Sequence, residues 1–323
     1  MNSITGGLLT IVIPCYNGEN YIHRCIASLS GLRDDISVLF VNDGSTDSSP
    51  QVIEKWISTR PNAYLVTKPN GGYATAINCG LDSCGSDYVM FLGIDDEIVV
   101  DSINEIANHL RKNSPDILAF TTTKVFDDRE SEQVTDPLTV YRKSGYFEAD
   151  LFSLYNEQTD NVRILFTRDT SRCFKMSCVG DIRYFGKIGV SSDGCFSILV
   201  ASRARSFEFL NVDGYVWHLH GDSVSARKKT KKRLLDEIIV WDAFFLYLQQ
   251  NFPDTPMPSP ILSYAYAYWQ VVCVLSKEDK VCAREHKKRV REVFGWLLNH
   301  RVPFGWRLKL TFPGLYRFWL KIS

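Results

Sequence analysis

Three neighbouring acids follow an apolar segment of the sequence. Residues 87–100 read DYVMFLGIDDEIVV, so Asp95, Asp96 and Glu97 come directly after a run that is typical of a buried strand. Because burying an unpaired carboxylate is costly, we expect these acids at an edge of the structure. Adjacent carboxylates there suit either a divalent cation site or a solvated turn that caps a helix beginning near Asp101.

Two further polar clusters also follow apolar runs. Tyr16 and Asn17 end the run at residues 10–16, and the cluster at residues 42–45, Asn-Asp-Gly-Ser, ends a second run. In parallel α/β sheets, ligands bind beyond the carboxyl ends of the strands. Three polar clusters at strand ends therefore predict one shared ligand site.

Strand-like and helix-like segments alternate through the first 125 residues. Strands are predicted at residues 10–16, 37–49 (running into a polar turn), 63–67, 87–92 and 116–123, and helices at residues 19–32, 50–59, 71–84 and 102–112. Nearly continuous apolar strands separated by helices indicate an α/β fold with a mostly parallel sheet covered on both faces. Further helices are predicted at residues 234–251, 261–275 and 280–300, after a mixed region and around a proline-rich linker at 253–260.

The bulk composition is that of an ordinary globular protein. Lys+Arg and Asp+Glu each number 37 among 323 residues, so no net charge points to nucleic acid as a partner. Nine cysteines without a CxxC pair favour reduced thiols in the cytoplasm. No run reaches the roughly 18 apolar residues that span a bilayer, and the N-terminal segment lacks the basic start of a signal peptide.

Four segments, in their order and spacing, resemble the nucleotide-binding half of the family 2 inverting glycosyltransferases of bacterial surface-polysaccharide type. They are TIVIPCYNGENYI, FVNDGSTDSS, NGGYATAINCGL and YVMFLGIDDE. The resemblance covers residues 8–125 closely and 160–226 more loosely. It implies the GT-A fold, a Rossmann-like nucleotide-binding sheet, and transfer of a sugar from a nucleotide-diphospho-sugar, in particular a UDP-sugar, to a glycan or lipid-linked acceptor.

The resemblance also implies a domain organisation. Residues 1–225 would form the GT-A domain, with the donor-binding half at 8–125 and the acceptor half at 126–225. Residues 226–323 would form a helical C-terminal region. In its tail, residues 303–323, aromatic and basic residues interleave, which suits either a membrane interface on the cytoplasmic side or packing on the helix at 261–275. The basic run 227–233 suits a diphosphate, an anionic lipid or a solvated face.

Donor binding is implied for ten positions that match the family's motifs. They are Pro14, Tyr16, Asn17, Glu19, Asp43, Asn70, Gly71, Gly72, Asn78 and Asp95. In this scheme Tyr16 and Glu19 approach the nucleoside, Asp43 accepts the uracil N–H, and the two glycines let backbone amides approach phosphate.

The same positions also fit structural roles. Asn17 can form a turn, Glu19 can lie at a helix start, and Asn78 can be a buried hydrogen-bonding residue. Ile77 stands where many family members carry Arg or Lys, so a cation that those members have is missing from this position.

A metal site is implied at the acid cluster. Many members carry Asp-x-Asp-Asp where this chain has Gly93, Ile94, Asp95 and Asp96. By resemblance, Asp95 contacts the ribose and Asp96 binds Mg²⁺ or Mn²⁺, which would neutralise the departing nucleoside diphosphate. His220 would complete the metal shell or touch the diphosphate.

His220 has a neighbour, His218, that lies on the same face if the segment is a strand. The two residues equally suit a pair of hydrogen-bonded structural histidines.

A catalytic base is implied at Asp193, within IRYFGKIGVSSDGCFSILVA. Inverting transfer needs a base that removes the proton of the acceptor hydroxyl, and in the family this base often follows a second acid. Ser192 replaces that acid here. The alternative is an Asp-Gly turn between two segments.

Two rival functions remain open from the sequence. A catalytically silent GT-A-fold scaffold fits the absence of the first acid at Gly93, of a cation at Ile77 and of the acid at Ser192. A nucleotidyltransferase would need a basic, glycine-rich loop after the first strand, and the loop CYNGENY has no basic residue.

Overall fold

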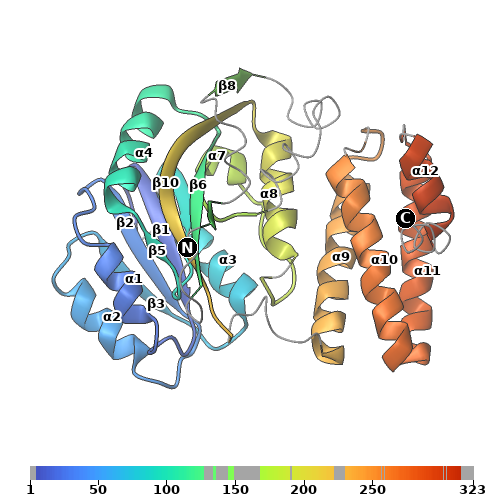
Figure 1. Cartoon of the computed structure of the whole chain (residues 1–323), viewed down its shortest axis with the longest axis horizontal. Helices are drawn as coiled ribbons and strands as arrows, with labels where there is room; N and C mark the ends of the chain where they lie inside the picture. Colours follow the sequence, from blue (N-terminus) through green and yellow to red (C-terminus); the bar gives the residue numbers. More distant parts are fainter. Residues whose placement is uncertain are drawn as a thin grey trace.

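The computed structural model describes residues 5–126, 134–135, 145–148, 168–189, 191–221, 230–255, 257, 259–300, 302 and 304–313. Within these ranges a ten-stranded mixed sheet occupies the first part of the chain, and helices α9–α12 stand beside it (Figure 1).

The first four strands form the parallel part of the sheet, in the order β3-β2-β1-β4. They are β1 (Leu9–Cys15), β2 (Ile36–Asn42), β3 (Ala63–Thr67) and β4 (Tyr88–Phe91). Every residue of β1, β2 and β4 is buried, because helices cover both faces, and this is why these strands are continuous apolar runs in the sequence. Cys15 pairs with Asn42, so the carboxyl ends of β1 and β2 meet at one edge, as predicted.

The remaining strands make the sheet mixed. They are β5 (Glu97–Ile98), β6 (Ile117–Phe126), β7 (Val134–Thr135), β8 (Gly145–Glu148), β9 (Arg172–Lys175) and β10 (Ser206–Leu219). β9 lies antiparallel between β4 and β6, and β6 runs parallel to β10. The register of β10 shifts between Leu210 and Tyr215, which is the signature of a bulge that bends the strand.

Helices cover the two faces of the sheet. On one face lie α1 (Ile22–Ser28), α2 (Ser49–Ile57) and α4 (Val100–Asn113), and on the other lie α3 (Tyr73–Ser83), α7 (Met176–Val179) and α8 (Ser192–Arg203). α8 is buried nearly all round, with Gly194–Ala201 entirely inside the protein. A helix without a solvent face must be covered on both sides.

The C-terminal helices supply the second cover. They are α9 (Lys231–Asn251), α10 (Ser259–Glu278) and α11 (Lys280–Leu298), in agreement with the predicted helices, and α12 (Phe304–Thr311), which was not predicted. Their apolar side chains belong to the same hydrophobic cluster as α3 and α8, and the ring of Phe185 lies 6.3 Å from that of Phe244. Among the described residues, no helix has both the length and the hydropathy that crossing a bilayer requires.

Two predictions lie partly outside the described residues. The boundary predicted near residue 225 falls between the described positions 221 and 230, and the tail is described only for residues 304–313 and for residue 302 before its start. Both stay predictions.

Candidate active site

The acid cluster lies in a tight turn after β4. The amide of Asp96 donates to the carbonyl of Gly93 at 3.1 Å, and the next residue, Glu97, begins β5, which pairs antiparallel with β10. The turn is therefore held against β10, a strand more than 100 residues later in the chain.

The two aspartates of this turn have different surroundings. Asp96 is 6% exposed, and its two carboxylate oxygens accept from the Tyr215 hydroxyl at 2.5 Å and from the amide of His218 at 2.9 Å. Burial, together with the charge of Asp95, raises the pKa of the Asp96 carboxyl to about 7. Both oxygens of Asp96 are thus occupied by β10, and the residue fixes the turn in place.

Asp95, by contrast, opens to solvent. Its side chain is 34% exposed, and its Oδ2 lies 3.1 Å from Nε2 of His220. The imidazole of His220 stacks on the ring of Tyr21, with centroids 4.6 Å apart, and its Nδ1 lies 3.2 Å from the Tyr21 hydroxyl. Asp95 and His220 therefore place one carboxylate and one imidazole side by side at the carboxyl edge of the sheet.

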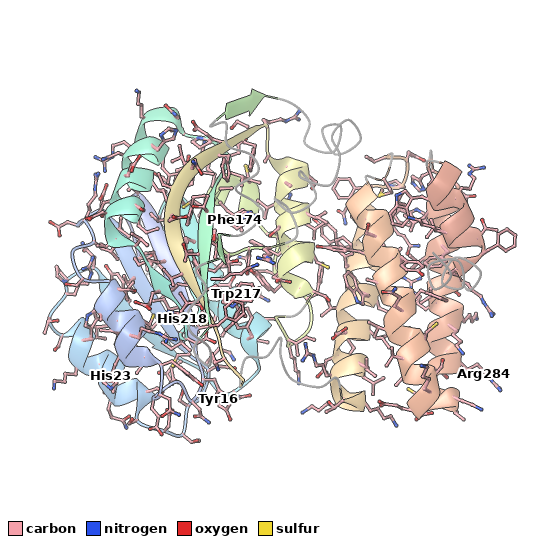
Figure 2. The ribbon with its side chains drawn as sticks, viewed as in Figure 1. Tyr16, His23, Phe174, Trp217, His218 and Arg284 are labelled. Atoms are coloured by element: carbon pink, nitrogen blue, oxygen red, sulfur yellow. The ribbon has the colours of Figure 1, made fainter. Side chains whose placement is uncertain are left out.

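The second histidine serves the neighbouring acid. His218 is buried, and its Nε2 contacts Oε1 of Glu97 at 2.6 Å. Arg24 ties the same turn to α1, donating to the carbonyl of Asp95 at 2.6 Å. The predicted histidine pair thus divides between two acids, and His220 is the member beside the exposed one. Figure 2 shows His218 and Tyr16 toward the same end of the molecule.

Gly93 occupies the position where many family members carry an acid. A Cβ added there would lie 2.8 Å from Oδ1 of Asp95 and 2.7 Å from Oδ2 of Asp96. The two carboxylates thus converge on the space over this glycine. The conformation of the acid turn in this chain therefore requires glycine at position 93, because a side chain there would clash with both carboxylates.

The turn after β1 is braced by the loop after β2. Asn17, at φ 50°, accepts from the amide of Thr46 at 2.8 Å, and Glu19 accepts from the hydroxyl of Ser48 at 2.9 Å. Pro14 is buried within β1, where it pairs with Val41. Asn17, Glu19 and Pro14 therefore carry structural contacts in this state, and their donor contacts stay predictions.

Tyr16, in the same turn, is 52% exposed. Its ring is therefore open to a ligand at this edge of the sheet.

Asp43 organises the loop before α3. Its carboxylate accepts from the amides of Gly71 at 3.0 Å and Gly72 at 2.8 Å, and it forms an ion pair with Lys68. Asn70 donates to the carbonyl of Asp43 at 3.0 Å. The amides that are predicted to approach phosphate thus face Asp43 here, and a cation missing at position 77 is present nearby at Lys68.

Asn78 joins α3 to the segment before α8. Its side-chain amide donates to the carbonyl of Tyr184 at 3.0 Å, and its Oδ1 accepts from the amide of Tyr184 at 2.8 Å. These paired bonds match the structural alternative stated for Asn78.

Asp193 lies in the first turn of α8. It is half-buried, and its Oδ1 accepts from the amide of Gly194 at 2.8 Å. Burial and the charge of Asp169 raise the pKa of the Asp193 carboxyl to about 7. The Asp-Gly pair therefore starts a helix and is not a turn between two segments.

A second buried acid accompanies this base candidate. Asp169 is 3% exposed and accepts from the hydroxyl of Tyr184, whose ring stacks on Phe196 of α8 at 4.7 Å. The pKa of the Tyr73 hydroxyl is raised by burial and by the charges of Asp169 and Asp193, and by those of Asp95 and Asp96. The Tyr73 ring lies 6.5 Å from that of Tyr184, which contacts Asp169.

Sequence reasoning missed several of these residues. They are Tyr21, Lys68, Tyr73, Asp169, Tyr184 and Tyr215. Only Lys68 had a local signal, since it directly follows a predicted strand. The others become neighbours of the site through long-range packing.

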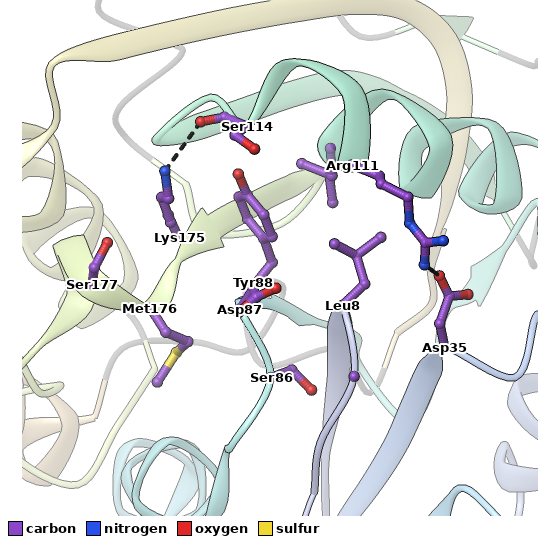
Figure 3. Close-up of a pocket in the computed structure, with 12 residues that line it drawn as sticks. Leu8, Asp35, Ser86, Asp87, Tyr88, Arg111, Ser114, Lys175, Met176 and Ser177 are labelled. Carbon is purple, nitrogen blue, oxygen red and sulfur yellow. Dashed lines mark hydrogen bonds and ion pairs between the residues drawn. The ribbon is translucent and has the colours of Figure 1, made fainter.

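The opposite edge of the sheet holds a cavity of about 660 Å³ (Figure 3). It is lined by Leu8 and Tyr88 at the amino ends of β1 and β4, and by Lys175 and Arg111. Lys175 donates to the carbonyl of Ser114 at 3.2 Å, and Arg111 pairs with an acid as described next. With both cations engaged, we assign this cavity no ligand.

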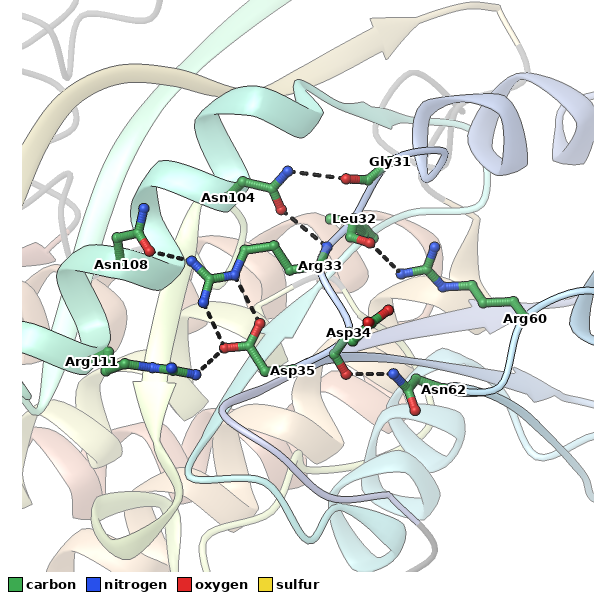
Figure 4. Close-up of polar contacts among 10 residues, drawn as sticks. All are labelled: Gly31, Leu32, Arg33, Asp34, Asp35, Arg60, Asn62, Asn104, Asn108 and Arg111. Atoms are coloured by element: carbon green, nitrogen blue, oxygen red, sulfur yellow. Dashed lines mark hydrogen bonds and ion pairs between the residues drawn. The ribbon is translucent and has the colours of Figure 1, made fainter.

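A polar cluster fixes this amino edge (Figure 4). Arg33 donates two hydrogen bonds to the carboxylate of Asp35, at 2.9 and 3.0 Å, and Arg111 of α4 forms an ion pair with the same carboxylate. Asn104 of α4 accepts from the amide of Arg33 at 3.2 Å. The charged groups of this cluster at the amino edge are thus paired with one another, whereas the carboxyl edge presents Tyr16 and Asp95 to solvent.

Comparisons with known proteins agree with this geometry. The model of Glycosyl transferase family 2 matches residues 10–176, just over half of the chain. A chondroitin synthase of Pasteurella multocida is 35% identical over 118 residues, which are 36% of this chain and 12% of that protein. The chain thus spans a small part of this curated relative.

Solved structures share the fold. The structure of S. aureus TarS 1-349 in complex with UDP-GlcNAc has a TM-score of 0.63 at 17% identity, covering 90% of this chain and 80% of that chain. The mannosyltransferase PcManGT from Pyrobaculum calidifontis, in complex with GDP-Man and Mn²⁺, has a TM-score of 0.51 at 16% identity, covering 98% of this chain and 84% of that chain.

Proposed function

Because the chain belongs to glycosyl transferase family 2 and has the GT-A fold, we propose that it is a metal-dependent inverting glycosyltransferase. It takes a nucleotide-diphospho-sugar, in particular a UDP-sugar, and transfers the sugar to a glycan or lipid-linked acceptor. One observation carries the proposal: Asp95, beside the mostly buried His220, lies at the same carboxyl edge of the sheet as the exposed Tyr16.

The donor set fits a divalent cation, with one change from the sequence-based assignment. Asp96 has both oxygens engaged by β10, so we assign the metal to Asp95 together with His220. In the described part of the chain no three His, Cys, Asp or Glu side chains gather to hold a metal, so donor phosphates and water must complete the shell. The imidazole favours Mn²⁺ over Mg²⁺.

The residues of the chain divide the remaining work. The cation, when bound, neutralises charge on the leaving nucleoside diphosphate. The exposed ring of Tyr16 is available to stack on the nucleobase of the donor. Asp43 holds the loop of Gly71 and Gly72 through bonds to their amides. Asp193 accepts the proton of the acceptor hydroxyl, because among the described residues only its Oδ1 is engaged, by Gly194, and its raised pKa suits a base near neutral pH.

We infer a cytoplasmic location from the cysteines. None of the nine forms a disulfide, which supports a cytoplasmic setting, where nucleotide-sugars would meet the open carboxyl edge.

Calorimetric titration of UDP with and without Mn²⁺ tests the metal assignment. Asp95→Asn is expected to weaken Mn²⁺-dependent UDP binding by about 10- to 100-fold, since it removes an exposed anionic ligand. Asp96→Asn should keep the Mn²⁺ dependence and instead lower the melting temperature, because it disturbs the contacts to Tyr215 and His218.

Asp101→Asn, at the exposed start of α4, is the control for loss of a surface carboxylate. If Asp95→Asn binds Mn²⁺ and UDP as the wild type does, the assignment is wrong. If the wild type binds neither UDP nor GDP with either metal, the proposed function itself fails.

The support given by Tyr21 leads to a second prediction. Tyr21→Phe removes the hydroxyl that lies 3.2 Å from Nδ1 of His220 but keeps the stacked ring. Partners of a ligating imidazole fix its orientation and basicity, so we expect Mn²⁺ affinity to fall about 10-fold. Tyr21→Ala should cost more, because it also removes the ring. Equal Mn²⁺ affinity in wild type and both variants would show that His220 is not a ligand.

A further inference from the structure

One side of α11 carries a cluster of exposed cations. They are Lys280, Arg284, Lys287, Lys288 and Arg291. At about 100° per residue these five fall within about 100° of the helix circumference. The buried residues of α11, Ala283, Val290, Val293, Phe294 and Leu297, occupy a separate, adjoining part of the circumference. We call the five cations the basic sector of α11.

The basic sector has no partners in the described part of the chain. None of its five side chains makes an ion pair or a side-chain hydrogen bond there, whereas Arg289 on the same helix contacts Asp242 at 3.6 Å and Glu292 at 3.4 Å. Cations three and four residues apart repel one another and weaken a helix. The sector therefore does not serve the fold, and an external anion would relieve this repulsion.

The start of α9 extends the same surface. Lys231 bonds Asp279, the N-cap of α11, at 2.8 Å, which brings the first turns of α9 and α11 together. Lys232 beside it is exposed and has no partner among the described residues. Lys232 thus adds a sixth cation near the first turn of α11, where Lys280 and Arg284 lie.

An exposed apolar residue borders the sector. Val281 is 81% exposed and lies on the solvent side of α11, next to Lys288 in the helical projection. Cations beside an exposed apolar side chain match the boundary between lipid headgroups and acyl chains. Figure 2 shows Arg284 on the outer side of the C-terminal helices, and Tyr16 below the sheet at the other side of the view.

We propose that the basic sector of α11, with Lys232 and Val281, binds an anionic lipid surface. The surface so bound lies on the C-terminal helices, on the side away from the sheet. If the proposed function holds, this contact keeps the enzyme at the membrane in which its acceptors are anchored. The lipid contact itself requires no transferase activity.

Vesicle co-sedimentation of the full chain tests the proposal. We expect binding to phosphatidylcholine vesicles that contain phosphatidylglycerol, little binding to phosphatidylcholine alone, and loss of binding as salt rises. Each cation near an anionic surface is worth about five-fold in partitioning, so Arg284→Gln/Lys288→Gln/Arg291→Gln should bind about 100-fold more weakly.

A matched triple variant controls for net charge. Lys55→Gln/Lys112→Gln/Arg205→Gln removes three other exposed cations and should bind vesicles like the wild type. Melting temperatures of both variants confirm folding.

Three results would overturn the proposal. These are equal vesicle binding by the two triple variants, equal binding of the wild type to neutral vesicles, and tighter binding of a DNA duplex that the sector variant loses. Retained Mn²⁺-dependent UDP binding in such a case would leave the proposed function intact.

Discussion

Asp193→Asn is expected to lower kcat about 10³-fold while leaving donor binding nearly unchanged. An amide cannot accept the proton of the acceptor hydroxyl, and a general base contributes about 10²- to 10⁴-fold. The substitution is nearly isosteric, and its Oδ1 can still accept from the amide of Gly194. Single-turnover assays, with UDP titration as the binding control, measure both quantities.

The pH dependence of the wild type gives a second signature of this base. Burial and the charge of Asp169 raise the pKa of the Asp193 carboxyl to about 7, so kcat should rise with pH through that value and then level off. Asp169→Asn removes the negative charge and should move the midpoint to lower pH. A wild-type rate that is flat between pH 5 and 8 would contradict the role of Asp193.

The raised pKa of Asp193 also affects the stability of the folded protein. The folded protein holds the Asp193 proton more tightly than the unfolded chain, so this group's contribution to stability falls as pH rises from the ordinary aspartate pKa to about 7. Above that range the Asn variant should melt at the same temperature as the wild type or higher. A variant that loses activity and also melts much lower would instead indicate that Asp193 holds α8 in place.

Gly93→Asp, which restores the acid that many family members carry, is expected to abolish metal-dependent donor binding. The new Cβ would lie 2.7 Å from an oxygen of Asp96 and 2.8 Å from one of Asp95, so the acid turn must move. Overpacking of this kind costs about 1–3 kcal/mol, and the added carboxylate introduces like-charge repulsion. Thermal unfolding and Mn²⁺-dependent UDP titration report the two effects.

Gly93→Ala separates the steric effect from the charge. It should lower stability through the same close contacts but impair Mn²⁺ binding less than Gly93→Asp does. Higher affinity for Mn²⁺ and UDP in Gly93→Asp would mean that the turn can rearrange, and that the glycine is simply a missing ligand.

Much of the parallel part of the sheet could be predicted from the sequence because β1, β2 and β4 are buried on both faces and are therefore continuous apolar runs. The strand predicted at residues 63–67 matches β3, which is only half-buried. The mixed half could not be predicted in the same way. β9 has only four residues and includes the fully buried Arg172, and the bulge in β10 breaks its period of two.

The site divides along the same line. The ends of the predicted strands are local features, and they suffice to place the acids, Tyr16 and Asp43 at one edge of the sheet. They do not reveal which acid is accessible to solvent, because Asp96 is covered by Tyr215 and His218, more than 100 residues away in the chain. The pairing of Asp169 with Tyr184 beside Asp193 is likewise a product of tertiary packing and has no sequence period.

The nearly complete burial of α8 limits which residues of the C-terminal helices can diverge in sequence. The helix with the base candidate is enclosed by the sheet on one side and, through a shared hydrophobic cluster, by the C-terminal helices on the other. The C-terminal helices are therefore a wall of the catalytic half and not an exchangeable module. Substitutions that remodel their inner face will reach Asp193 through α8, so their membrane-facing side is freer to diverge than the side that packs against the site.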